Sequence, residues 1–73
     1  MDFVIEAGRR LLPLEVKSRR RVRLADASGL QAFLEEHPKS APFGLLVYGG
    51  DEVLALSKRI LAVPVGCLWG RSG

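Results

Sequence analysis

The chain has 73 residues, enough for one small domain that buries about 60% of the surface its unfolded chain exposes. Its single cysteine excludes an internal disulfide and the multi-cysteine metal sites, and no stretch reaches the roughly 18 apolar residues of a membrane span. The formal net charge of +3 is a mild basic excess. We expect a cytoplasmic protein without a signal peptide and with Cys67 in its core.

The first predicted elements are two strands, residues 2–6 and 11–17, that form a hairpin. Gly8 marks the turn, because glycine takes a positive φ at no steric cost. A two-residue loop at Gly8 and Arg9 fixes the register of the strands. In that register the expected core face carries Phe3, Ile5, Leu12, Leu14 and Val16.

Three charged residues lie close together in this predicted hairpin. The register places Asp2 directly opposite Glu15, and directly opposed residues have Cβ atoms roughly 5 Å apart. Glu15 and Lys17 share a face because alternate residues of a strand point the same way. Two carboxylates at this spacing can share one divalent cation of the Mg²⁺ type. The alternative is an exposed Asp-Glu-Lys cluster on the solvated side of a sheet, with no chemistry.

A basic segment follows the hairpin. Five of the eleven basic residues lie in residues 17–23, and Arg9 and Arg10 in the turn add two more. Clustered positive charge beside a carboxylate pair suits a polyanion such as DNA. A solvated basic loop is the alternative, since no aromatic residue is interleaved to stack on bases. The candidate nucleic-acid-binding residues are Arg19, Arg20, Arg21 and Arg23.

One helix is predicted next, from Ser28 or Gly29 to Glu36. Residues 26–28 offer N-cap side chains, and the helix ends before Pro38 because the residue before proline disfavours the helical conformation. The apolar face of this helix carries Leu30, Phe33 and Leu34.

The rest of the chain predicts short elements. They are a buried strand over residues 42–48, a turn at 49–51, a short strand or helical turn at 53–56, a last strand at 59–63, a helical turn at 64–69 that starts at Pro64, and a disordered tail at 70–73.

The predicted order strand-strand-helix-strand-strand indicates an α/β (α+β) fold with a mixed sheet. A strand-helix-strand unit makes parallel neighbours through a right-handed crossover, whereas the hairpin strands are antiparallel. One helix covers only one face, so the other face and the sheet edges stay bare. We therefore expect a truncated core that an upstream segment or a second copy of the chain completes.

The hairpin resembles the PD-(D/E)XK nuclease superfamily, and nearly the whole chain resembles the C-terminal part of the DUF4143 domain of AAA-type ATPases. The resemblance rests on residues 2–6, 12–18 and 62–65. It implies a restriction-endonuclease-like fold, with residues 1–69 as a single nuclease-like domain fragment of a longer ATPase chain. No P-loop motif occurs within the 73 residues.

The resemblance also implies roles for the charged residues of the hairpin. Asp2 and Glu15 are expected to bind Mg²⁺, and Lys17 to orient or activate the attacking water in phosphodiester hydrolysis of DNA. Whether this chain is an enzyme stays open, and we expect little or no cleavage by these residues alone. The alternative function is a non-catalytic module that binds nucleic acid or a protein. A third possibility is self-association through exposed sheet edges.

Overall fold

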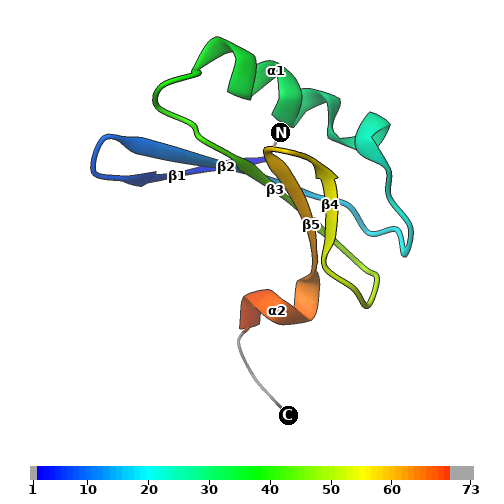
Figure 1. The fold of residues 1–73 in the computed structure, drawn as a ribbon. Helices are drawn as coiled ribbons and strands as arrows, with labels where there is room; N and C mark the ends of the chain where they lie inside the picture. Colours follow the sequence, from blue (N-terminus) through cyan, green and yellow to red (C-terminus); the bar gives the residue numbers. More distant parts are fainter. Residues whose placement is uncertain (1, 70–73) are drawn as a thin grey trace.

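A five-stranded mixed sheet forms the centre of the computed structural model, which describes residues 2–69 (Figure 1). The strand order across the sheet is β1-β2-β3-β5-β4. In chain order the elements are β1 (Phe3–Ala7), β2 (Arg10–Val16), the short 3₁₀ helix η1 (Leu24–Ala27), α1 (Ser28–Glu36), β3 (Gly44–Tyr48), β4 (Leu54–Ser57), β5 (Ile60–Pro64) and α2 (Val65–Trp69).

The pairing of the strands confirms the predicted α/β class. β1 and β2 are antiparallel, β3 is parallel to both of its neighbours, β2 and β5, and β4 returns antiparallel to β5. Helix α1 forms the crossover between β2 and β3, as expected for parallel neighbours. Residues 54–57 are a strand and not a helical turn, so the sheet has one strand more than the predicted order. The expected tail at 70–73 lies outside the described residues.

The hairpin register is the predicted one. Gly8 has φ of 64°, which is the conformation that the two-residue loop requires. Pro13 lies opposite Val4 on the neighbouring strand. The remaining pairs are Phe3 with Leu14, Ile5 with Leu12, Glu6 with Leu11 and Ala7 with Arg10.

The expected core face of the hairpin was wrong. Helix α1 covers the opposite face of β2, where Pro13 is fully buried and a Cβ on Gly44 would lie 3.4 Å from Pro13 and 3.3 Å from Leu30 of α1. The expected core residues remain half-buried or exposed, with Phe3 at 59% and Ile5 at 48% of full exposure. Strand β2 carries apolar residues on both faces, so alternation alone does not say which face a helix covers.

The core lies between α1 and the sheet. Leu30 and Leu34 of α1 are buried against Leu46, Ile60 and Ala62 of β3 and β5. Leu30 and Leu34 have the helical spacing predicted for the apolar face of α1. In Figure 1 α1 lies above the sheet, and α2 lies below the end of β5.

Three smaller expectations were also wrong. Asp26 does not cap α1, because it lies inside η1 and Ala27 occupies the N-cap position. Pro64 ends β5, so α2 starts at Val65. Cys67 is exposed, because α2 packs at the end of β5 and not inside the core. No helix within residues 2–69 has the length and hydropathy needed to cross a membrane.

Candidate nucleic-acid interface

The basic segment, residues 17–23, forms a loop that leads from β2 to η1, here called the arginine loop. Its backbone follows the end of β3. The Lys17 N–H donates to the Val47 carbonyl at 2.8 Å, and the Gly49 N–H donates to the Arg19 carbonyl at 2.7 Å. The parallel pairing of β2 with β3 therefore brings the arginine loop beside residues 48–52, about thirty positions later in the chain.

Two glycines let these segments approach so closely. A Cβ on Gly49 would lie 3.1 Å from the Arg19 carbonyl oxygen, and a Cβ on Gly50 would lie 2.7 Å from that of Arg20. The Gly50 Cβ would also lie 2.3 Å from Cε2 of Tyr48. Any larger residue at position 50 must displace backbone or a packed ring.

Tyr48 fixes the turn after β3 through its hydroxyl group. Its ring is buried, with 3% exposure, and its hydroxyl donates to the Glu52 carbonyl at 2.6 Å. This bond closes residues 48–52 into a fixed turn. The ring faces the core, so it is not free to stack on a nucleic-acid base.

Asp26 shapes the other end of the arginine loop. Its Oδ2 accepts the backbone N–H of Arg23 at 2.8 Å, and its Oδ1 accepts from Nη1 of Arg19 at 3.0 Å. One carboxylate thus joins both ends of the loop. The residue predicted as a helix cap instead organises the arginines.

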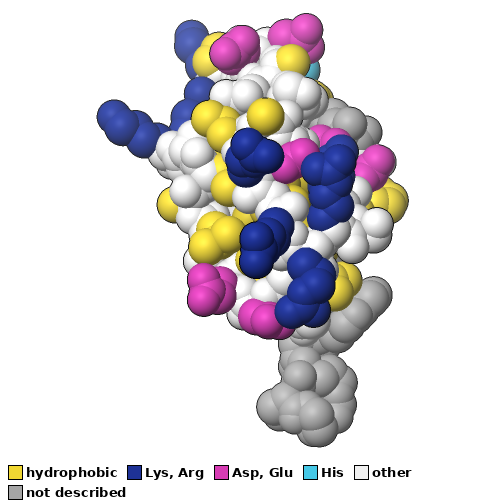
Figure 2. Space-filling model, turned by 90° about the vertical axis from the view of Figure 1, so that its right-hand side faces the viewer, with side chains coloured by type: hydrophobic (Ala, Val, Ile, Leu, Met, Phe, Trp, Pro, Cys, Tyr) yellow, Lys and Arg dark blue, Asp and Glu magenta, His cyan; other side chains and the backbone are white. Residues whose placement is uncertain are grey.

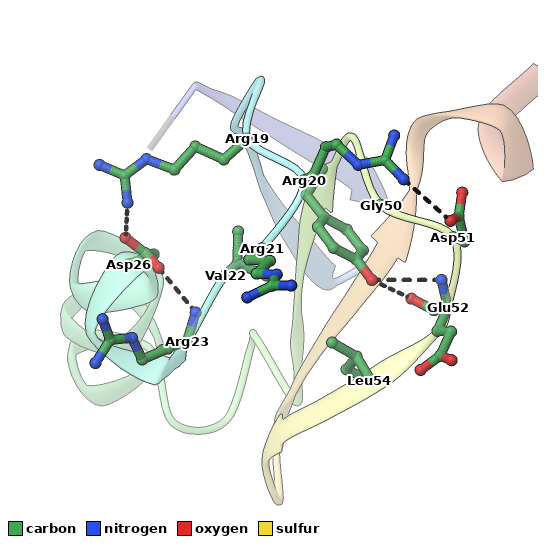
Figure 3. A pocket seen from close by; sticks show the side chains of 11 residues that line it. Arg19, Arg20, Arg21, Val22, Arg23, Asp26, Gly50, Asp51, Glu52 and Leu54 are labelled. Carbon is green, nitrogen blue, oxygen red and sulfur yellow. Dashed lines mark hydrogen bonds and ion pairs between the residues drawn. The ribbon is translucent and has the colours of Figure 1, made fainter.

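A cavity of about 740 Å³ lies between the arginine loop and the turn after β3 (Figure 3). Residues 19–23 and Asp26 line one side, and Tyr48, residues 50–52 and Leu54 line the other. Figure 3 shows a second ion pair across it, where Nη2 of Arg20 lies 3.3 Å from Oδ2 of Asp51.

The two ion pairs do not use all the arginines. Arg19 and Arg20 are paired, but their side chains remain 67% and 76% exposed. Arg21 and Arg23 are exposed and form no ion pair within residues 2–69. Figure 2 views the molecule from the right-hand side of Figure 1, and Lys and Arg side chains cluster down the middle of that face with a few acidic groups beside them.

The predicted hairpin site lies at the end of β2. Nζ of Lys17 is 3.2 Å from Oε2 of Glu15, whose side chain is only 13% exposed. The Asp2 N–H donates to the Leu14 carbonyl at 3.0 Å, and Oδ2 of Asp2 accepts the N–H of Val16 at 2.8 Å. Asp2, Glu15 and Lys17 therefore gather in one region, and Glu15 lies on the covered face of the sheet.

A hydrated Mg²⁺ ion requires accessible oxygen ligands and keeps several of its waters. Here Oδ2 of Asp2 and Oε2 of Glu15 already bind protein donors, and Oε1 of Glu15 is buried. No group of three or more Asp, Glu, His or Cys side chains suited to a metal occurs in the described part of the chain. The arrangement does not fit a hydrated ion as it stands, so the expected Mg²⁺ site remains a prediction that requires these hydrogen bonds and this ion pair to open.

Sequence reasoning identified the arginines but not the opposite side of the cavity. Tyr48, Gly50 and Asp51 were assigned only to a strand end and a turn. The signal was present in part, because two glycines directly after a strand indicate a close approach of backbone.

One comparison with known proteins identifies a family. The model of the "Domain of unknown function (DUF4143)" family matches residues 1–68. No curated protein and no solved structure matched the chain. The family match spans nearly all of the 73 residues and includes the hairpin, α1 and the arginine loop. The chain belongs to the DUF4143 family.

Proposed function

We propose that this domain is a non-catalytic module that binds nucleic acid through the phosphate groups held by its arginine loop. The observation that carries the proposal is the pair Arg21 and Arg23, two exposed guanidinium groups without an ion pair among residues 2–69. Both line the cavity. Guanidinium groups bind phosphate oxygens in a bidentate manner, which suits an arginine cluster to this ligand.

The paired arginines can contribute as well. An exposed ion pair is worth about 0–1 kcal/mol, so a phosphate can replace Asp51 on Arg20 at little cost. Arg19 differs, because Asp26 also fixes the loop backbone and is only 19% exposed. We infer that Arg20, Arg21 and Arg23 bind the phosphate groups, whereas Arg19 mainly holds the loop.

The composition of the cavity favours recognition of the phosphate backbone over recognition of bases. Tyr48, the aromatic residue in its lining, is buried and its hydroxyl is engaged. Stacking of bases on exposed aromatic rings supplies much of single-strand affinity in other proteins. Binding here is therefore expected to be weak, salt-dependent and largely independent of sequence.

The test is a titration of fluorescently labelled DNA with the chain at several salt concentrations. We expect the double variant R21A/R23A to bind more weakly at every concentration. The slope of log K against log salt concentration is negative, and its magnitude should decrease by about 0.7–0.9 for each phosphate group that the variant no longer binds. Lys39→Ala is the control, because Lys39 is exposed, lies in the turn after α1 and does not line the cavity.

Two results would contradict the proposal. One is affinity that does not change with salt, which indicates a protein partner in place of a polyanion. The other is a double variant that binds DNA as well as the Lys39→Ala control.

We propose that metal-dependent hydrolysis is at most an ancestral role of this domain, inherited with the nuclease-like hairpin from a longer ATPase. The nuclease resemblance assigns this role to Asp2, Glu15 and Lys17, but the carboxylates of Asp2 and Glu15 bind protein groups. We expect no nicking of supercoiled plasmid by the chain in the presence of Mg²⁺. Nicking that EDTA abolishes, and that is absent in both Glu15→Ala and Lys17→Ala, would show an active site.

A further inference from the structure

Strand β1 is an open edge of the sheet. Among residues 2–69 it has β2 on one side and no strand on the other (Figure 1). All five of its residues are exposed. Proteins protect such edges with proline, lysine, bulges or very short strands. The opposite edge, β4, has four residues and an irregularity between Ala55 and Ser57. Within β1 the single charge is Glu6, and neither proline nor a bulge interrupts the strand.

Pro13 determines which groups of β1 face outward. In an antiparallel pair, opposed residues alternate between those that exchange backbone hydrogen bonds and those that do not. Pro13 has no N–H, so its pair with Val4 is of the second kind. The backbone groups of Val4 and Glu6 therefore point away from β2 and present unpaired donors and acceptors at the edge.

We propose that the β1 strands of two copies of this chain pair antiparallel about a two-fold axis, with Ile5 at the axis. The occupant is a second copy because an antiparallel strand pair is self-complementary, as a two-fold interface requires. Within β1 only the even-numbered residues Val4 and Glu6 have backbone groups that point outward. An even-numbered residue of one copy must therefore lie opposite an even-numbered residue of the other. As a result the odd residues of both copies, including Phe3, share one face of the joined sheet.

The charges of β1 select the register. An axis at Glu6 would place two Glu6 carboxylates directly opposite each other. An axis at Val4 would place Asp2 of each copy opposite Glu6 of the other. Like charges directly opposed are destabilising. An axis at Ile5 avoids both clashes and pairs Val4 of each copy with Glu6 of the other through outward-facing backbone groups.

The same register suits the apolar side chains. It places Phe3 of each copy opposite Ala7 of the other, on the face that α1 leaves bare. Ala7 lines a hollow of about 200 Å³ together with Leu12 and Phe43. The exposed phenyl ring thus lies next to an apolar surface, and the two Ile5 side chains meet at the axis.

Cysteine cross-linking tests the register directly. Single Cys substitutions at Val4, Ile5 and Glu6 are placed in a Cys67→Ser background, because Cys67 is exposed. At the axis a non-hydrogen-bonded pair has Cα atoms about 4.5 Å apart, which a disulfide can span. Val4 or Glu6 of the two copies would be diagonal neighbours about 7–8 Å apart. We expect disulfide-linked dimer from Ile5→Cys and little from the other two. Equal or faster cross-linking at position 4 or 6 overturns the register.

Sedimentation of the wild-type chain up to about 1 mM tests the association itself, since a short strand pair buries little area and is expected to be weak. We expect the average mass to rise toward the dimer with concentration. Val4→Pro removes only an outward N–H, so it should leave a folded monomer. Ile5→Lys places two like charges at the axis and should do the same. A wild-type chain that stays monomeric overturns the proposal, as does a dimer that both variants retain.

Discussion

At the scale of single residues, two side chains have roles that their residue type and position in the sequence do not predict. Asp26 has the character of a helix cap, yet it binds both Arg19 and the backbone of Arg23 and so gives the arginine loop its shape. Tyr48 has the character of a strand residue, yet its hydroxyl closes the turn on the other side of the cavity. The arginines supply charge, and these two residues decide where that charge is held.

Gly50 is the residue on which this arrangement depends most. A Cβ at position 50 would overlap the Tyr48 ring and the Arg20 carbonyl. We expect Gly50→Ala to lower the free energy of unfolding by about 1–3 kcal/mol, the usual range for overpacking, and to weaken DNA binding because the turn moves away from the loop. Urea unfolding and the DNA titration measure the two effects.

Gly66→Ala is the matched control for this substitution. Apart from its chain neighbours and the backbone of its own helix, no atom of the described part of the chain lies within 4 Å of a Cβ at position 66, and alanine favours the helix that contains it. The control should be neutral or slightly stabilising. If Gly50→Ala unfolds at the same urea concentration as the wild type, the close approach does not constrain the turn.

At the scale of elements, the hairpin shows what sequence patterns can and cannot predict. The register followed from Gly8 and a two-residue loop, because both are local. The covered face did not follow, because β2 has Leu11 and Pro13 on one side and Leu12 and Leu14 on the other. The choice between them depends on the close approach of Leu30 and of Pro13 to Gly44, which is a long-range property of the crossover.

The candidate interface also has one side that the sequence predicts and one side that it does not. The arginine loop is a contiguous run, so composition alone identified it. The opposite side of its cavity comes from residues 48–52 and becomes a neighbour only through the parallel pairing of β2 with β3. The strand-helix-strand order predicts that these two strands are parallel neighbours. The contact between the loop after β2 and the turn after β3 was not predicted, because it depends on the close backbone approach at Gly49 and Gly50.

At the scale of the whole molecule, the sheet has two unlike faces. Helix α1 covers the face that contains Leu46, Ile60 and Ala62, all of which are almost fully buried. The other face is apolar but partly open, although Val47 on that side is buried. Its exposed members are Phe3, Ile5, Val16, Phe43 and Leu61. The pairing of two β1 strands would join the open faces of two copies into one surface.

Neighbouring residues of β5 test this asymmetry within one element. Ile60 points toward α1 and is 1% exposed, whereas Leu61 points to the open face and is 39% exposed. We expect Ile60→Ala to lower the free energy of unfolding by about 2–5 kcal/mol, because it removes buried methyl groups and leaves a cavity. Leu61→Ala should cost about 1 kcal/mol or less. Urea unfolding of dilute, monomeric protein measures both. A cost for Leu61→Ala equal to that of Ile60→Ala would mean that the second face is covered in the monomer.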